Sequence, residues 1–275
     1  DALAEGACYA ADRLFDGAGK RLLDHIYPRH MGQTNHWNGH WGTGGNIYFP
    51  FWLVPILQWC VDTRDPASDS THQYSTHMLS YLPVHGPNEG PLSVETARAV
   101  CERVYGEAGV ADAELGYERP ETKAIPAIFH HDRGMILESL LLCDKENQRV
   151  FSMETEDRMA DTALMAKLFS ACTGYETSEE ELDRAGERIF NLLRAIDVRN
   201  HGRDRAVDEQ TARDLQHPAF TDGVELDMDR FLEMLDVYYA LRGWNPANGW
   251  PTRDKLEELG LDDVADGLDS IGRLG

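Results

Sequence analysis

The stretch TSEEELDRAGERIFNLLRAI, residues 177–196, decides the fold class. Ser178 followed three residues later by Glu181 is the pattern of a capping box, which marks the start of a helix. The apolar residues after it recur with the spacing of one helical face: Leu182, Ala185, Ile189, Leu192, Leu193 and Ile196. The stretch therefore predicts a long amphipathic helix over residues 178–197.

The same helical spacing extends to both sides of this stretch. Apolar residues at three- and four-residue intervals predict further helices near 93–105, 155–172 and 229–242, the last ended by Gly243. Pro251 and Thr252 begin a final short helix. No long alternating run appears, so we expect a mainly α, irregular multi-helix domain with little sheet.

Two segments depart from the helical pattern. Residues 27–59 are rich in glycine and tryptophan, and we expect an irregular aromatic insertion there, because closely spaced glycines interrupt helices. Residues 203–222 are charged and lack periodicity, which predicts a surface loop. We treat residues 1–275 as a single helical domain that includes both segments.

The composition excludes some functions. The 275 residues contain 26 Lys and Arg against 48 Asp and Glu, a net charge of −22. Such a chain is repelled by nucleic acid and by anionic membrane surfaces, so neither is expected as a partner. The longest apolar run, residues 49–60, contains two prolines and is too short to span a bilayer. The five cysteines are scattered and odd in number, and we expect a cytoplasmic protein without a disulfide framework.

Self-contained catalytic motifs are missing from the sequence, which has no glycine-rich phosphate loop, CxxC pair, HExxH or GxSxG. His30, His36 and His40 lie in the aromatic segment, where a structural role is favoured over zinc binding. His72 follows a polar stretch that a loop could present to a pocket, although a lone histidine is more often structural. Cys143 closes an apolar stretch five residues after Glu138, and it could pack in a core or bind a metal.

Longer segments resemble the C-terminal part of the aldehyde:ferredoxin oxidoreductase family, the tungsten-bis-pterin enzymes. TGYETSEEELDRAGERIFNLLRAIDVRNHG (residues 173–202) and FLEMLDVYYALRGWNPANGWPTRDKLEELGL (residues 231–261) resemble its two C-terminal signatures. LAEGACYAADRL (residues 3–14) resembles another family segment. Lys123, the triplet 131–133 and SLLLCD follow the family's order. Residues 173–275 carry the most specific part of the resemblance.

The resemblance implies roles for four residues. Cys143 takes the place of the family cysteine that supplies the fourth thiolate to a [4Fe–4S] cluster. Glu138 stands at the aspartate of the family's pterin-binding turn, and cofactor binding extends to Leu142. His72 matches the histidine beside the tungsten, where an imidazole can exchange a proton with the carbonyl oxygen of an aldehyde. A ferredoxin-like protein would accept the electrons.

The sequence also departs from the family. Glutamate replaces aspartate at position 138, and Leu141 stands where the family has the glycine that lets the pterin approach the backbone. The family's CxxCxxxC cluster motif and its β-rich domain are missing from this sequence. The chain alone should therefore hold neither tungsten (or molybdenum) nor the cluster, and should need an N-terminal half or subunit. The rival interpretation is a noncatalytic helical remnant that binds a partner or a small ligand.

Overall fold

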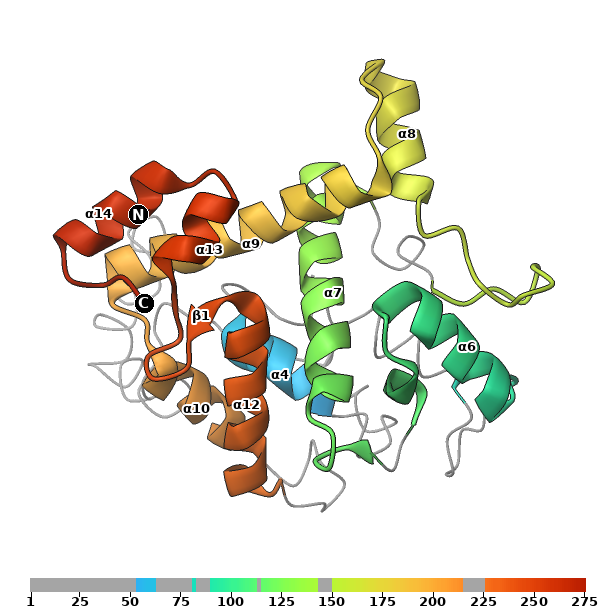
Figure 1. Ribbon diagram of the computed structural model, residues 1–275, viewed down its shortest axis with the longest axis horizontal. Helices are drawn as coiled ribbons and strands as arrows, with labels where there is room; N and C mark the ends of the chain where they lie inside the picture. Colours follow the sequence, from blue (N-terminus) through green and yellow to red (C-terminus); the bar gives the residue numbers. More distant parts are fainter. Residues whose placement is uncertain (1–52, 63–80, 83–89, 113–114, 143–149, 215–225) are drawn as a thin grey trace, which may run out of the picture. The chain divides into compact units, whose positions relative to one another are not determined.

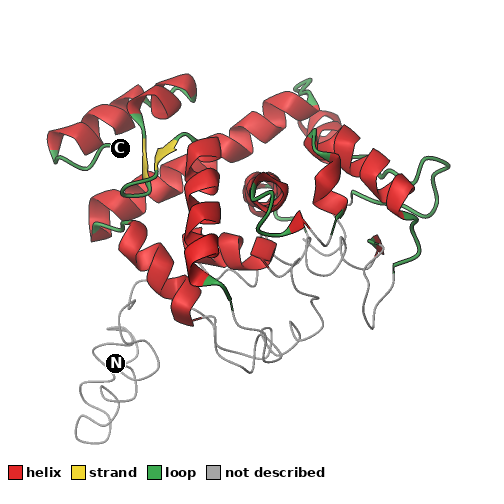
Figure 2. Cartoon of the chain, turned by 60° about the horizontal axis from the view of Figure 1, so that its bottom comes forward, coloured by secondary structure: helices red, strands yellow, loops and turns green. Residues whose placement is uncertain are grey.

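The computed structural model describes residues 53–62, 81–82, 90–112, 115–142, 150–214 and 226–275, all within one compact unit that spans residues 37–275. In chain order the described elements are α4 (Leu53–Val61), α6 (Val94–Tyr105), the 3₁₀ helix η4 (Ala108–Ala111), α7 (Glu121–Ser139), α8 (Leu164–Thr173), α9 (Glu179–His201), α10 (Arg205–Asp214), α12 (Met228–Arg242), β1 (Trp244–Asn245), β2 (Trp250–Pro251), α13 (Arg253–Glu258) and α14 (Asp262–Ser270). Within these residues the only sheet is the antiparallel pair β1–β2. The mainly α prediction is confirmed (Figure 2).

Helix α7 lies at the centre of the described residues, with α9, α12, α4 and α6 packed around it (Figure 1). The main hydrophobic core brings together α4, α6, α7 and α12 with Phe190 of α9 and Trp244 of β1. A second cluster joins the C-terminal half of α9 to α13 and α14. A third cluster joins the C-terminal end of α7 to α8 and to Leu182 of α9.

The crossing of α7 and α9 depends on a glycine. A Cβ atom placed on Gly186 would lie 2.2 Å from the carbonyl oxygen of Asp132, so a larger residue would force the two backbones apart. Glycine in a helix interior costs about 1 kcal/mol relative to alanine. The close packing of the two longest described helices is the compensation for that cost.

Three of the expected helices form as the spacing predicts. α6, α9 and α12 lie within a few residues of the predicted 93–105, 178–197 and 229–242 ranges. The Ser178 hydroxyl accepts a hydrogen bond from the Glu181 amide, and the Glu181 carboxylate accepts one from the Ser178 amide, which completes the capping box. Gly243 ends α12 in the left-handed conformation. The short helix after Thr252 is α13, and α14 follows it, so α13 is not the last helix.

The predicted helix over 155–172 is wrong in its first half, because α8 begins at Leu164. Residues 150–160 instead form a tight turn in which Phe151 and Met159 make an antiparallel bridge. The Asp157 carboxylate accepts a hydrogen bond from the Met159 amide, and Arg158 adopts a positive φ of 61°. Such local bonds from side chain to backbone compete with helix formation.

Two predicted irregular segments are corrected where the structure describes them. Residues 205–214 of the expected 203–222 loop form α10, whose inward side carries polar residues that a search for apolar periodicity passes over. Residues 53–59 of the expected 27–59 insertion belong to α4, where every residue is buried. Pro55 is compatible with this helix because amides in the first turn have no intrahelical partner. Residues 1–14 and 27–52 lie outside the described residues, and the single-domain extent stays a prediction.

Candidate functional site

Helix α7 carries most of the described candidate residues. Lys123, the triplet His131–Asp132–Arg133 and Glu138 all lie on it, and Leu142 follows its C-terminal end. Cys143 is the next residue in the chain, and both Cys143 and His72 lie outside the described residues. The structure therefore describes the helix that leads to the expected cluster ligand, and the roles of His72 and Cys143 stay predictions.

The end of α7 is a Schellman turn. The Leu142 amide donates to the Leu137 carbonyl at 2.8 Å, and the Leu141 amide donates to the Glu138 carbonyl at 3.2 Å. Leu141 occupies the left-handed position of this turn, with φ of 56°. Glycine is the usual residue there, because a side chain with Cβ costs about 1–2 kcal/mol in that conformation.

The three leucines of this turn have different surroundings. Leu140 and Leu142 pack against the third hydrophobic cluster, which contains Leu137 of α7 and Met165 of α8. Leu141 is 92% exposed, so burial does not offset its backbone strain. Leu142 therefore has a packing role in addition to the expected cofactor contact, and Glu138 is half-buried beside it.

Arg133, five residues before Glu138 on α7, fixes the orientation of this helix. Its guanidinium group donates to the Thr162 carbonyl at 2.7 Å and to the carboxylates of Asp183 at 2.8 Å and Glu179 at 2.5 Å. Only 3% of its side chain is exposed. These contacts tie α7 to the first turns of α9 and to the segment that precedes α8.

Asp132 and His131 point into the core instead of toward a surface site. Arg242 of α12 donates to the Asp132 carboxylate at 2.5 Å, and burial nevertheless raises the pKa of Asp132 to about 6. Burial, together with the nearby Arg242 charge, lowers the pKa of His131 well below its usual value, so its imidazole is neutral at pH 7.

The hydrogen bonds of His131 define its tautomer. Nε2 lies 3.3 Å from the Gln58 carbonyl oxygen, which can only accept, so Nε2 carries the proton. Nδ1 then accepts from the Tyr238 hydroxyl at 2.9 Å. Tyr238 in turn accepts from Nε of Arg242 at 3.1 Å. This chain of bonds joins α4, α7 and α12, and it gives His131, the first residue of the triplet, a structural role.

Lys123 is fully buried at the start of α7. Its ammonium group donates to the Asp112 carbonyl at 3.1 Å. Burial lowers its pKa from 10.5 to about 8, while the nearby Asp112 carboxylate limits the shift. A buried lysine with a depressed pKa is chemically distinctive, although it also occurs in structural positions.

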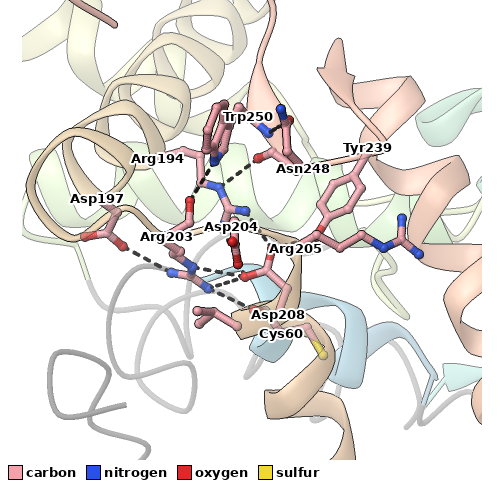
Figure 3. Close-up of polar contacts among 12 residues, drawn as sticks. Cys60, Arg194, Asp197, Arg203, Asp204, Arg205, Asp208, Tyr239, Asn248 and Trp250 are labelled. Atoms are coloured by element: carbon pink, nitrogen blue, oxygen red, sulfur yellow. Dashed lines mark hydrogen bonds and ion pairs between the residues drawn. The ribbon is translucent and has the colours of Figure 1, made fainter. Parts of the chain in front are cut away.

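A second buried cluster of charges was not predicted from the sequence (Figure 3). Arg194 of α9 donates to both carboxylate oxygens of Asp208 on α10, at 3.1 and 2.7 Å. The Tyr239 hydroxyl donates to the same carboxylate at 2.6 Å, and Nε of Arg203 does so at 3.0 Å. Burial acts to raise the pKa of Asp208, but the two guanidinium groups outweigh it and hold this pKa below its usual value.

The cluster also holds the end of α4. Arg203 donates to the backbone carbonyls of Cys60 at 2.8 Å and Asp62 at 2.6 Å, which lie at the C-terminal end of that helix. Burial raises the pKa of the Cys60 thiol well above its usual value, so this cysteine is not a reactive thiolate. The cluster therefore has a structural role, because it joins α4, α9, α10 and α12. In the sequence, Arg203 and Asp208 are visible only as part of a charged stretch without periodicity.

The described residues contain no group of three or more His, Cys, Asp or Glu side chains that could hold a metal ion. None of their helices is long and apolar enough to cross a membrane. The part of the candidate site that the structure describes is therefore the turn at Glu138–Leu142 and the helix that orients it.

The family model described as aldehyde ferredoxin oxidoreductase, domains 2 and 3, matches residues 72–261. The chain belongs to the aldehyde ferredoxin oxidoreductase family. This confirms the resemblance on which the candidate residues rest, and all four of them lie within the matched range.

Curated relatives are tungsten-containing aldehyde ferredoxin oxidoreductases. The protein from Thermococcus kodakarensis is 37% identical over 95 residues, which is 34% of this chain and 15% of the relative. The protein from Pyrococcus furiosus is 34% identical over 95 residues, with the same shares. The matches thus span less than a fifth of the length of these relatives.

A solved structure shares the fold. It is titled as the active site complex BamBC of benzoyl coenzyme A reductase in complex with 1,5 dienoyl-CoA. The TM-score is 0.58 at 19% sequence identity, and the match covers all of this chain and 38% of the other. At this identity the likeness supports the arrangement of the helices alone.

Proposed function

We propose that this chain is the C-terminal part of a tungsten (or molybdenum) pterin oxidoreductase that oxidises an aldehyde or a related carbonyl compound in the cytoplasm. A [4Fe–4S] cluster, with Cys143 as one of its ligands, would supply the electron-transfer route to a ferredoxin-like acceptor. The enzyme is complete only with an N-terminal half or subunit that carries the CxxCxxxC motif. The observation that supports this most is the family match over residues 72–261, which contains His72, Glu138, Leu142 and Cys143.

The turn after α7 is compatible with a bound pterin at its backbone. Leu141 holds the left-handed conformation that glycine adopts most readily. Its side chain is exposed and makes no contribution to the third cluster, so the turn does not depend on leucine for packing. A pterin approaching this backbone would have to accommodate the Leu141 side chain.

In this proposal the residues of the chain have distinct roles in binding the cofactors and the substrate. Glu138 and Leu142 would contact the pterin, and the Cys143 thiolate would complete the ligands of the cluster. The metal and pterin, when bound, would supply the two-electron chemistry of carbonyl oxidation. His72 would hold or release a proton at the carbonyl oxygen of the substrate. Arg133, through Thr162, Glu179 and Asp183, would keep α7 in the orientation that places this turn.

The second candidate function is a noncatalytic family member that binds a partner or a small ligand. The exposed Leu141 favours it, because an apolar side chain replaces the glycine of the family's turn. The two functions differ in metal content, which makes them separable by experiment.

The test is the metal content of the assembly that contains this chain, purified under anaerobic conditions from its native host through a tag on the chain. We expect tungsten or molybdenum and about four iron atoms per assembled site. The 275-residue chain produced alone serves as the control and should contain neither metal. An assembly that lacks iron, tungsten and molybdenum would contradict the catalytic proposal and favour the noncatalytic one.

A further inference from the structure

Helix α8 presents an apolar face to solvent. Leu164 and Leu168, one helical turn apart, are 43% and 40% exposed. Cys172, one further turn along, is exposed as well, and Tyr175 just after the helix is 73% exposed. Residues at i, i+4 and i+8 lie on the same side of a helix, so these side chains form one continuous stripe. We call Leu164, Leu168 and Cys172 the α8 face.

The contacts of α8 do not account for this apolar stripe. The helix has ten residues and buries Met165 and Ala166 against the third cluster. In Figure 1 it projects away from the other described helices. Helices of this length are marginal in water unless tertiary packing supports them. An exposed apolar stripe on such a helix is typical of a surface that another polypeptide covers.

The charge of the chain segment that contains α8 indicates the chemistry of that polypeptide. Residues 154–181 contain eight acidic residues (Glu154, Glu156, Asp157, Asp161, Glu176, Glu179, Glu180 and Glu181) and two basic ones (Arg158 and Lys167), a net charge of 2 − 8 = −6. Lys167 is paired with Asp161 at 2.6 Å. Arg103 and Arg133, from outside this segment, pair with Asp157 and Glu179, and the net charge with these two arginines included is 4 − 8 = −4. Two copies of this surface would repel each other, whereas a surface rimmed by lysine or arginine would be attracted.

We propose that the α8 face binds an amphipathic helix of a different polypeptide, one whose apolar stripe is flanked by lysine or arginine side chains. The apolar stripes would pack together as in other helix-in-groove and helix-pair contacts. The acidic residues around α8 would meet the basic rim of the partner and select it over a second copy of this chain. The proposal concerns α8 alone and does not depend on whether the protein carries a metal.

The test uses two synthetic peptides of the same leucine and lysine composition. In one peptide the leucines follow helical spacing, and in the other the order is scrambled so that no apolar face forms. Binding to the full chain is measured by fluorescence anisotropy at physiological salt. We expect the patterned peptide to bind about tenfold more tightly than the scrambled one. Equal affinities would overturn the proposal, because charge alone would then explain binding.

A matched set of variants locates the contact. Leu164→Gln with Leu168→Gln should reduce the affinity for the patterned peptide to that of the scrambled one. Leu241→Gln, at another exposed leucine that is 47% exposed on α12, should leave the affinity unchanged. Retention of tight binding by the double variant would place the contact elsewhere and overturn the proposal.

Sedimentation equilibrium of the wild-type chain tests the alternative occupant. A wild-type dimer that becomes monomeric in the double variant would show that a second copy covers the α8 face, which contradicts the proposal. If the double variant fails to fold by circular dichroism, the comparison of the two peptides on the wild-type chain still decides the outcome.

Discussion

Two regions of this molecule differ in whether the contacts of their side chains compensate for an energetic cost. In the Arg194–Asp208–Arg203 cluster, charges that are costly to bury are paired and hydrogen-bonded from every side. At the end of α7, Leu141 adopts a strained backbone conformation with its apolar side chain in solvent. The first region is fully determined by its own contacts. In the second region the contacts of the Leu141 side chain do not offset the strain of its backbone, and strain of this kind concentrates at functional positions.

The largest expected effect is on the buried cluster. Asp208→Ala removes the carboxylate that pairs with the buried Arg194 and leaves Arg203 with Asp197 as its carboxylate partner, which should lower the free energy of unfolding by about 3–5 kcal/mol. Urea denaturation followed by circular dichroism measures this change. Glu233→Ala, at an exposed position of α12, is the matched control and should change stability by less than about 0.5 kcal/mol. Similar unfolding midpoints for the two variants would contradict a structural role for the cluster.

A second buried charge should make stability depend on pH. Because burial lowers the pKa of Lys123 from 10.5 to about 8, the unfolded chain binds more protons between these pH values than the folded chain does. The free energy of unfolding that Lys123 contributes therefore rises with pH over this window, by up to about 3 kcal/mol.

Lys123→Met isolates this contribution, because the tyrosines and cysteines that also titrate in alkali remain in both proteins. In parallel urea titrations, the free energy of unfolding of the wild type minus that of the variant should become more positive as the pH is raised from 7 to 10. A constant difference in unfolding free energy between the two proteins would show that the buried ammonium group is not destabilised.

The third prediction concerns His72, the proposed proton-transfer residue, in the assembly that contains this chain. His72→Ala should lower the turnover of aldehyde by about 100-fold, the usual scale for loss of a general acid–base group, while the metal content stays unchanged. His77→Ala is the matched control, since it removes a histidine from the same stretch of sequence. Full activity of His72→Ala would reject the catalytic assignment and make His77 the next candidate.

The smallest expected effect is at the turn itself. Leu141→Gly relieves the left-handed strain and should raise the free energy of unfolding by about 0.5–1 kcal/mol, because glycine's extra freedom in the unfolded chain offsets part of the gain. Leu142→Gly removes a side chain that packs on the third cluster and should lower it by about 1–3 kcal/mol. If both substitutions destabilise the chain equally, Leu141 has packing contacts that its exposure does not indicate.

The parts of the fold that the sequence predicted are those where apolar periodicity and caps coincide. The helix after Ser178 has both signals, and α9 forms as expected with its capping box. α10 lacked the apolar periodicity, although Asp204 caps its first turn, because its inward residues Asp208 and Thr211 are polar. Ion pairs join this helix to distant segments. Pairing between Arg194 and Asp208 is a tertiary property, and no local pattern in the sequence reports it.

For the candidate site, the order of the residues along one helix was predictable from the sequence, but the orientation of their side chains was not. The order of Lys123, the 131–133 triplet and Glu138 in the sequence was informative, because one helix carries all of them. Their individual orientations were not predictable: His131 and Asp132 face the core, and Arg133 holds α9. The resemblance suggested Leu141 as a departure from a glycine, but the strained conformation that makes this departure costly emerges only from the backbone.

The central claim is that the end of α7 leads into a cluster ligand, and the iron content of the assembled enzyme tests it most directly. The comparison is between Cys143→Ser and Cys172→Ser, the second being an exposed cysteine on α8 that serves as the control. Iron is measured by mass spectrometry on assemblies purified anaerobically, together with the electron paramagnetic resonance signal of the reduced cluster. The account predicts that Cys143→Ser loses or degrades the cluster while Cys172→Ser keeps the iron of the wild type. An unchanged cluster in Cys143→Ser would contradict it.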